Sequence, residues 1–194
     1  MPAQVWRGSY ALARYCAAHS DLCSGRSVLE LGSGTGLLGL WLSSNDQAAA
    51  AGPKRVLLTD VPAMLPLLRK NLSHNKSRLC CDVSCEVLDW TVPLSEAITK
   101  ALPCDVIVAA DVLYEPEFVA PLLSTLLASA RTDTCVIMAL SHRVPELEAE
   151  FFGTAAPHFD TVDVTRQSPD AEMLISGSVS IFRLSRKPWR DDDT

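Results

Sequence analysis

Short, almost continuously apolar runs alternate along the chain with stretches in which apolar residues recur every three or four positions. The runs are typical of buried parallel strands, and the stretches are typical of amphipathic helices. Strands that alternate with helices predict a parallel sheet with helices on both faces. We predict strands at residues 28–31, 55–60, 81–88, 104–111, 134–141, 159–164 and 178–185.

Helices are expected to cover this sheet. Leu65, Leu68 and Leu72 have the spacing of an amphipathic helix. Pro66 is expected to mark the start of that helix, because an interior proline forfeits a hydrogen bond. Ser9 is the expected N-cap of the first helix. The predicted helices span residues 5–20, 36–44, 62–75, 91–101, 116–127 and 146–156.

The last two predicted strands are joined by a long segment without a helical pattern, so we expect an antiparallel hairpin at one edge of the sheet. The predicted fold class is therefore α/β, a Rossmann-like doubly wound sheet of seven strands. A length of 194 residues suits one domain. We place this domain at residues 1–185 and expect the charged tail at 186–194 to be disordered.

The composition is that of a soluble globular protein. Apolar residues make up 48% of the chain and charged residues 21%, which excludes wholesale disorder. No stretch approaches the roughly 18 uninterrupted apolar residues of a transmembrane helix, so none is expected. The first residues lack the basic and apolar regions of a secretory signal.

The cysteines and the net charge indicate the cellular compartment of the protein and the kind of partner it binds. The seven cysteines are scattered, with no Cys-x-x-Cys pair and no partner group at zinc spacing. We therefore expect reduced thiols in a cytoplasmic protein, and no metal site. The net charge of −6 argues against general binding of a phosphate backbone, which needs a basic face. The negative charge is compatible with a basic protein substrate, since an acidic surface attracts lysine-rich segments.

One predicted strand runs directly into a glycine-rich turn, with Glu30 two positions before Gly32 and further glycines at 34 and 36. Glycine tolerates positive φ and lets a ligand approach the backbone closely. The spacing differs from the dinucleotide fingerprint, whose turn holds a pyrophosphate. Glu30 would repel such an anion and would suit a cofactor with an amino group and ribose hydroxyls. The glycines alone also fit a purely structural tight turn.

Acidic residues stand at the ends of three further predicted strands: Asp60, Asp89 and Asp111. Ligands of open α/β sheets bind outside the carboxyl ends of the strands, so these side chains are expected to converge on one edge. There Asp60 could hydrogen-bond ribose hydroxyls or cap the helix that follows it. Two aromatic residues, Trp90 and Tyr114, accompany these acids.

The chain resembles the family-16 methyltransferases, seven-stranded class I enzymes that use S-adenosyl-L-methionine and mostly methylate lysine in other proteins. Asp111-Val-Leu-Tyr114 matches the Asp-x-x-Tyr motif of the family, and Asp89-Trp90 and Trp6 match its aromatic positions. The resemblance covers roughly residues 4–185 and looks closest to the branch that modifies elongation factor 2. It implies a cytoplasmic monomer acting on a protein substrate such as a translation factor or a chaperone.

The resemblance also implies roles for single residues. Asp111 would accept a hydrogen bond from the lysine nitrogen, and Tyr114 would line the lysine channel. Alternatively, Asp111 caps the next helix and Tyr114 packs on it, while the tryptophans fit a plain core role. The residues implied for the cofactor are Gly32, Ser33 and Gly34 around its methionine part, Asp60 at the ribose, Asp89 and Trp90 at the adenine, Ala110 beside the sulfonium and Trp6 over the whole. Glu30 is expected to join Asp60, Asp89 and Asp111 in a ring of strand-end acids around this cationic cofactor.

Other functions stay open. A methyltransferase of this fold could act on another protein residue, a small molecule or a nucleic acid. Enzymes for nucleic-acid amino groups usually carry Asn/Asp-Pro-Pro-Tyr, however, and Asp111-Val-Leu-Tyr114 lacks both prolines. A non-catalytic scaffold would not need the intact glycines and strand-end acids. Five residues precede Trp6, fewer than in most members, so the resemblance bears more on cofactor binding than on substrate recognition.

Overall fold

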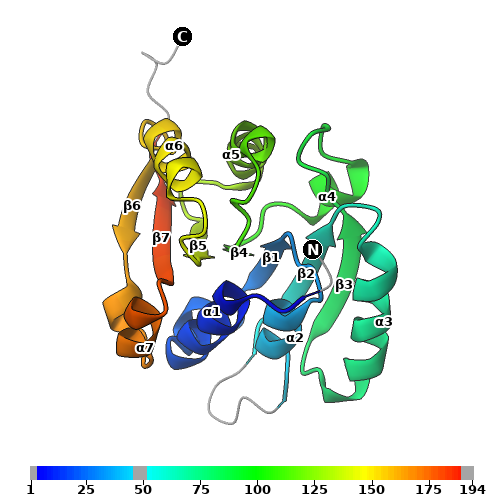
Figure 1. Ribbon diagram of the computed structural model, residues 1–194. Coiled ribbons are helices and arrows are strands. Elements are labelled where there is room, and N and C mark those ends of the chain that lie inside the picture. Colours follow the sequence, from blue (N-terminus) through cyan, green and yellow to red (C-terminus); the bar gives the residue numbers. More distant parts are fainter. Residues whose placement is uncertain (1–3, 46–51, 189–194) are drawn as a thin grey trace.

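The structure is a computed structural model, and it describes residues 4–45 and 52–188. Its strands form one sheet in the order β3-β2-β1-β4-β5-β7-β6 (Figure 1). β1 to β5 are parallel, and β7 is antiparallel to both β5 and β6. The predicted seven-stranded sheet with an antiparallel edge hairpin is confirmed. The strands are β1 Ser27–Leu31, β2 Arg55–Asp60, β3 Asp82–Val87, β4 Val106–Ala110, β5 Cys135–Leu140, β6 Phe159–Asp163 and β7 Ser180–Arg186.

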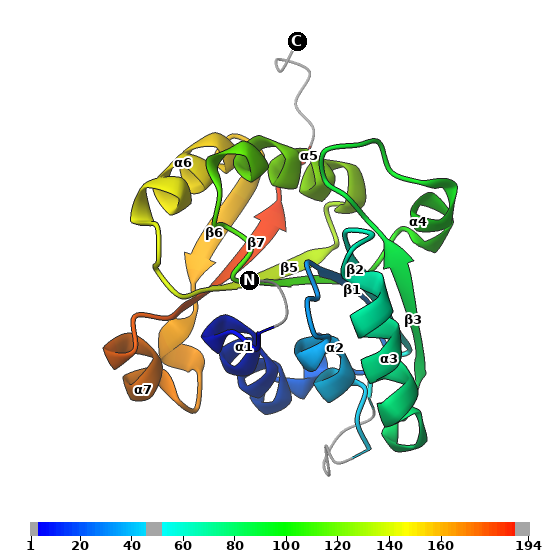
Figure 2. The same ribbon diagram turned by 45° about the vertical axis from the view of Figure 1, so that its right-hand side comes forward.

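Helices cover both faces of the sheet, as the alternating pattern predicts. In Figure 2, α4, α5 and α6 lie above the sheet, while α1, α2, α3 and α7 lie below it. The helices above the sheet are α4 Glu96–Ala101, α5 Val119–Ser129 and α6 Pro145–Ala155. The helices below it are α1 Arg7–Ala18, α2 Leu37–Leu42, α3 Leu65–Asn75 and α7 Ala171–Ser176.

Each face of the sheet has its own hydrophobic core. Successive side chains of a strand point to opposite faces. Val28 and Val106 accordingly pack with the residues of α1, α2 and α3, whereas Leu29 and Ile107 pack with those of α4, α5 and α6. Because both faces are buried, the central strands β4 and β5 are apolar throughout instead of alternating.

The first helix begins within its predicted range of 5–20, but ahead of its predicted N-cap. α1 starts at Arg7, its N-cap residue is Trp6, and no side chain of the cap position bonds the helix. The expectation that Ser9 is the N-cap is therefore wrong, and Ser9 lies within the first turn. The free N–H of Gly8 instead donates to a carboxylate oxygen of Asp111, 2.9 Å away. Asp111, which is distant in sequence, thus caps the N-terminus of α1.

The third helix begins next to Pro66 as expected, three residues after the predicted limit of residue 62. α3 starts at Leu65, and Pro66 occupies its first turn, where the missing N–H costs nothing. Its N-cap residue is Met64, and no side chain caps it. Asp60 therefore does not cap this helix.

The connection between β6 and β7 is helical, against the prediction of a loop. It contains the 3₁₀ helix η4, Thr165–Gln167, and the six-residue helix α7. Leu174 is buried in the core next to α1, and Asp170 pairs with Arg14 of α1. A helix of this length offers too few apolar repeats for its period to be recognised.

The predicted start of the disordered tail is also early. Arg186 belongs to β7, and its guanidinium donates to the carbonyl oxygens of Leu127 and Ala130 at the end of α5. The remainder of the predicted tail, residues 189–194, lies outside the described residues.

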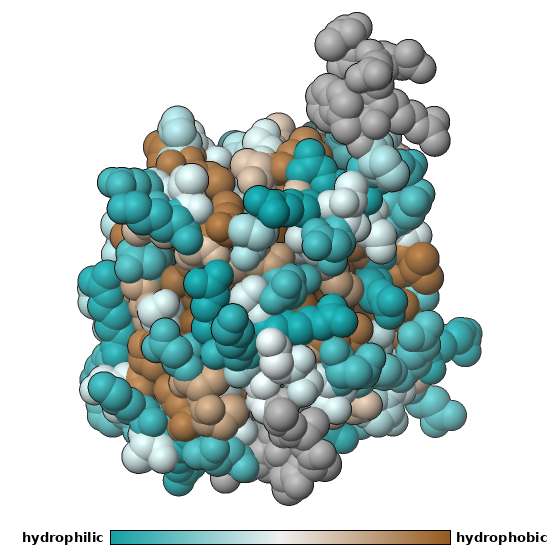
Figure 3. All heavy atoms as spheres, turned by 180° about the vertical axis from the view of Figure 1, so that it is seen from behind, coloured by the Kyte–Doolittle hydropathy of each residue, from teal (hydrophilic) through white to brown (hydrophobic). Residues whose placement is uncertain are grey.

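Polar and apolar side chains are interspersed over the face seen in Figure 3, which is typical of a surface in contact with water. Among residues 4–45 and 52–188, no helix is long and apolar enough to cross a membrane. All seven cysteines belong to this part of the chain and are free thiols, as their scattered positions predict.

Candidate active site

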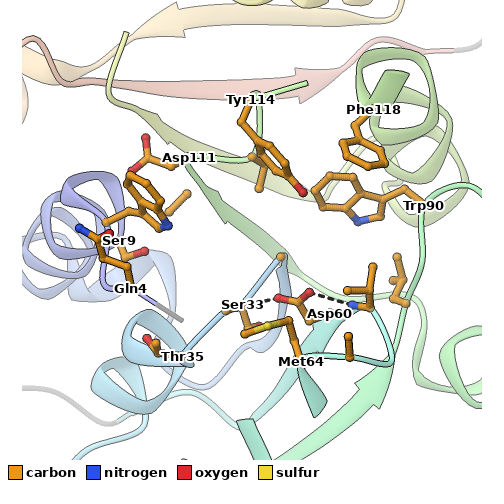
Figure 4. Close-up of a pocket in the computed structure, with 18 of the residues that line it drawn as sticks. Gln4, Ser9, Ser33, Thr35, Asp60, Met64, Trp90, Asp111, Tyr114 and Phe118 are labelled. Carbon is orange, nitrogen blue, oxygen red and sulfur yellow. Dashed lines mark hydrogen bonds between the residues drawn. The ribbon is translucent and has the colours of Figure 1, made fainter. Parts of the chain in front are cut away.

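A cavity of about 250 Å³ opens at the carboxyl ends of the central parallel strands. The strand order reverses between β1 and β4, and both have their carboxyl ends here. This is the place at which open α/β sheets bind ligands. Figure 4 shows Asp111 and Tyr114 along one wall, with Ser33, Asp60 and Met64 along the opposite one. The other predicted site residues on the wall are Trp6, Gly32, Gly34, Asp89, Trp90 and Ala110.

The floor of the cavity is the glycine turn after β1. Gly32, Gly34 and Gly36 all have positive φ, at 63°, 55° and 80°. A Cβ on Gly36 would lie 2.7 Å from Cδ1 of Leu68, and one on Gly32 would lie 3.3 Å from the Trp90 ring. Side chains are therefore disfavoured here by the backbone conformation, and at Gly36 also by the close approach to the core residue Leu68. At Gly32 and Gly34, which line the cavity, the bare backbone is open to a ligand.

Asp60 joins this turn to the end of β2. One carboxylate oxygen accepts a hydrogen bond from the Gly34 N–H at 2.7 Å, and the other accepts from the Val61 N–H at 2.8 Å (Figure 4). Burial raises the pKa of Asp60, while these two hydrogen bonds lower it. The carboxylate thus holds the glycine turn and still faces the cavity.

The Asp89-Trp90 pair follows β3 and forms the side wall. The carboxylate of Asp89 accepts two hydrogen bonds from Thr91, and these hold the pKa of Asp89 below its usual value. Trp90 packs edge-on against Phe118 and against the core beneath α4 to α6. Its Nε1 is buried without a hydrogen-bond partner. Trp90 is therefore a core aromatic that also lines the cavity.

Asp111, directly after β4, joins the start of α1 to the end of β5. It has a positive φ of 55°, which Asp tolerates better than most residues. One carboxylate oxygen accepts from the Gly8 N–H at 2.9 Å, and the other accepts from the Ser141 N–H at 2.8 Å. A Cβ on Gly8 would lie only 2.7 Å from this carboxylate. The N-cap of α5 is Phe118, so the alternative that Asp111 caps that helix is wrong.

Tyr114 stands at the mouth of the cavity, with 47% of its surface exposed. Its ring packs against Phe118 with centroids 5.5 Å apart, so the predicted contact with the next helix is present as well. Burial raises the pKa of its phenol, and the negative charges of Asp60, Glu115 and Glu117 raise it further. The hydroxyl therefore stays protonated at neutral pH.

Glu30 is the one predicted cofactor residue that the structure does not bring to the cavity. It points to the α2 face of the sheet, like Val28 two positions earlier, and is 2% exposed. Its carboxylate accepts a hydrogen bond from the Gly39 N–H in α2 at 3.0 Å. Burial raises the pKa of Glu30 to about 8. Its position fits a support for the glycine turn, not a contact to a ligand in the cavity.

Sequence reasoning missed Arg143. This residue follows β5 and lines the cavity, and its guanidinium carbon lies 4.2 Å from the ring centroid of Trp6. Its Nη2 also donates to the carbonyl oxygen of Asp111 at 3.3 Å. A polar residue just beyond the carboxyl end of a central strand is the signal that could have found it.

Comparison with known proteins agrees with this geometry. Residues 1–157 match a family model described as lysine methyltransferase. Over 170 residues the chain is 30% identical to the protein-lysine N-methyltransferase EFM6 of Saccharomyces cerevisiae, a match that covers 84% of this chain and 68% of that protein. Over 132 residues it is 32% identical to the human protein-lysine N-methyltransferase EEF2KMT, covering 63% of this chain and 38% of that protein.

A solved structure agrees at the level of the fold. A ribosomal protein L11 methylase from Lactobacillus delbrueckii subsp. bulgaricus superposes with a TM-score of 0.58 at 17% identity, covering 91% of this chain and 78% of the other. At this identity the likeness shows a shared class I methyltransferase fold and nothing finer. The match of the family model over residues 1–157 shows that the chain belongs to the lysine methyltransferase family.

Proposed function

We propose that the protein transfers a methyl group from S-adenosyl-L-methionine to the side-chain nitrogen of a lysine in a protein substrate. The observation that carries this proposal is that a single cavity holds both the glycine turn and the Asp111–Tyr114 pair. Family membership supports the reaction class, and the two relatives above are named as enzymes of this kind.

The residues present fit the cofactor. The glycine turn is a cradle that a Cβ at Gly32 would narrow, because it would lie against the cavity residues Val112 and Trp90, and this suits close approach of the methionine part. Asp60 is a carboxylate at a strand end, where ribose hydroxyls would be bound. The unpartnered Nε1 of Trp90 is a spare donor beside the adenine position. Asp89 and Ala110 would complete this contact set, with Trp6 over it.

The chemistry needs orientation more than covalent help. The cofactor supplies a methyl group on a positively charged sulfur. With the cofactor bound, the neutral lysine nitrogen would form a bond to that carbon, the carbon–sulfur electron pair would stay with sulfur, and a proton would leave the nitrogen for water. Asp111 would accept a hydrogen bond from the lysine nitrogen and stabilise the charge that develops there. Each of its oxygens accepts one backbone N–H and keeps further acceptor capacity.

Tyr114 would hold the lysine side chain against the reacting carbon. Its exposed ring at the cavity mouth suits an aliphatic stem or a methylated ammonium group. Glu115 and Glu117 lie close enough to act on the Tyr114 phenol, so the entrance is acidic. This charge, with the net −6 of the chain, supports a substrate segment rich in basic residues.

The substrate protein is proposed at a coarser level. A translation factor or chaperone fits the family resemblance, and closeness to the elongation factor 2 branch stays a prediction, because identities of 30% and 32% do not separate the two relatives. A cytoplasmic monomer with a single domain at residues 1–185 also stays a prediction, with the free thiols in favour of the location.

Two measurements test the function. In the first, the protein is incubated with isotopically labelled S-adenosylmethionine and a cell extract, and labelled proteins are digested and mapped. Label on lysine is expected, and its loss in an Asp111→Asn variant would tie it to this site. Label that enters RNA or small metabolites instead would reject the lysine assignment. In the second, calorimetry measures cofactor binding, and a lack of binding at millimolar cofactor would leave only the scaffold alternative.

A further inference from the structure

We propose that Arg143 is a positioning residue of this site, which holds Trp6 across the cofactor cavity. The inference deepens the proposed function and rests on it. Trp6 lines the cavity together with Arg143, and the guanidinium carbon of Arg143 lies 4.2 Å from the Trp6 ring centroid. A cation this close to an indole face is attracted by the ring electrons.

Within residues 4–45 and 52–188, the Arg143 guanidinium is the recorded hydrogen-bonding, ionic or ring contact of the Trp6 side chain. Its backbone is extended, with φ −95° and ψ 155°, and it precedes the first hydrogen-bonded turn of α1. Val5, just before it, is 52% exposed. The N–H of Gly8 is held by Asp111, which fixes the start of α1 but not the indole. The stacked guanidinium supplies the contact that orients the ring.

Arg143 can do this because the two residues before it, Ser141 and His142, are both held by hydrogen bonds. The Ser141 N–H donates to Asp111. His142 has a positive φ of 39°, and its ring nitrogens lie 2.6 Å from Oε2 of Glu148 and 2.7 Å from Oγ of Ser180. These contacts tie the segment to α6 and β7. A side chain on a fixed backbone loses less freedom when it binds, so its hold on Trp6 is preorganised.

The same guanidinium also touches the reacting side of the cavity. Its Nη2 donates to the carbonyl oxygen of Asp111, and its charge acts on the phenol of Tyr114. Arg143 therefore bridges the residue that would cover the cofactor and the residue that would meet the lysine. Its aromatic contact predicts an effect on cofactor affinity that is separate from the chemical step.

The test is a double-mutant cycle on Arg143 and Trp6, read by calorimetry with S-adenosylhomocysteine. Arg143→Met keeps a long side chain but removes the cation, and we expect it to raise the dissociation constant about 2- to 5-fold, the range of an exposed cation–π contact. Arg143→Lys, which keeps a cation over the ring, should recover most of the affinity. In a Trp6→Leu background, Arg143→Met should have no further effect, because the two side chains act through one contact.

The control is Arg78→Met, which removes an exposed positive charge. Arg78 belongs to the 3₁₀ helix η2, Lys76–Arg78, and does not line the cavity, so this substitution should leave the cofactor affinity unchanged. With a methylated substrate in hand, Arg143→Met should raise KM for the cofactor by the same factor and change kcat by less than about 2-fold. Equal effects of Arg143→Met with and without Trp6, or no effect at all, would overturn the proposal. Binding of S-adenosylhomocysteine requires no lysine, so a failed lysine-labelling experiment counts against the proposed function and not against this contact.

Discussion

Replacing Asp111 by alanine removes a carboxylate that two backbone N–H groups share. The Gly8 N–H and the Ser141 N–H each lose their acceptor, at 2.9 and 2.8 Å. Asp111 is 6% exposed, so water cannot readily replace it. A hydrogen bond to a charged group contributes about 1.5–3 kcal/mol when buried, and less for the part-buried Ser141 bond. Alanine at a φ of 55° adds about 1 kcal/mol of strain. We expect a total loss of about 3–5 kcal/mol in the free energy of unfolding.

This magnitude changes how an Asp111 variant must be interpreted. A loss of 3–5 kcal/mol is a large part of the roughly 5–15 kcal/mol that a domain has. Loss of methyl transfer in Asp111→Ala would therefore mix unfolding with chemistry. Asp111→Asn is the sharper variant, because asparagine tolerates positive φ and its carbonyl oxygen still accepts one N–H. We expect Asn to lose about half as much stability as Ala, and still to lose most of the transfer activity.

The assay is urea unfolding of the wild type and both variants, with cofactor affinity and lysine labelling measured on the folded fraction. If Asp111→Ala unfolds within about 1 kcal/mol of the wild type, the two hydrogen bonds do not hold the junction as described. If Asp111→Asn keeps both its stability and full activity, the assignment of the developing charge to this carboxylate is wrong.

Three further predictions concern the glycine turn, the cavity mouth and the buried acid. Gly36→Ala should lower both the free energy of unfolding and the cofactor affinity, because its Cβ would lie 2.7 Å from Leu68 and its φ is 80°. Gly153→Ala is the control: a Cβ at this position of α6 has nothing within 4 Å, so the substitution should not destabilise the fold. Tyr114→Phe should leave kcat/KM for the protein substrate within about 3-fold, and Tyr114→Ala should lower it about 10-fold or more, because only the ring is needed as a wall. Urea unfolding between pH 4.5 and about 8 should show stability falling as pH rises, since folded Glu30 keeps a proton that the unfolded chain releases, and Glu30→Gln should flatten this slope.

Much of the fold could be predicted from the sequence because the apolar residues recur at regular spacings. Leu65, Leu68 and Leu72 give a helical period, and unbroken apolar runs give buried strands, so seven strands and both helix layers could be predicted. The helix α7 could not, because six residues with one buried apolar side chain, Leu174, carry no period. Asp60 and Asp111 were found as cavity residues because a strand end is recognisable in sequence.

The positions of the Glu30 and Arg143 side chains could not be predicted from the sequence. Glu30 is near a strand end, but the pleat turns its side chain to the face of Val28 and away from the cavity. Arg143 follows β5 as a single basic residue, and nothing in the local pattern indicates that it meets Trp6. Both outcomes depend on which face or partner a side chain reaches, and that is set by tertiary packing rather than by position along the chain.

The two halves of the cavity differ in what fixes them. The cofactor half consists of strand ends and glycines held by backbone hydrogen bonds, such as those from Gly34 and Val61 to Asp60. The lysine half ends in the exposed Tyr114 and its acidic neighbours. Asp111 belongs to both, because its carboxylate fixes α1 and the end of β5 and the residue also lines the cavity where we propose that the lysine reacts. Changes at the rim should therefore alter which protein is methylated without loss of cofactor binding, whereas changes at Asp111 should alter stability and transfer together.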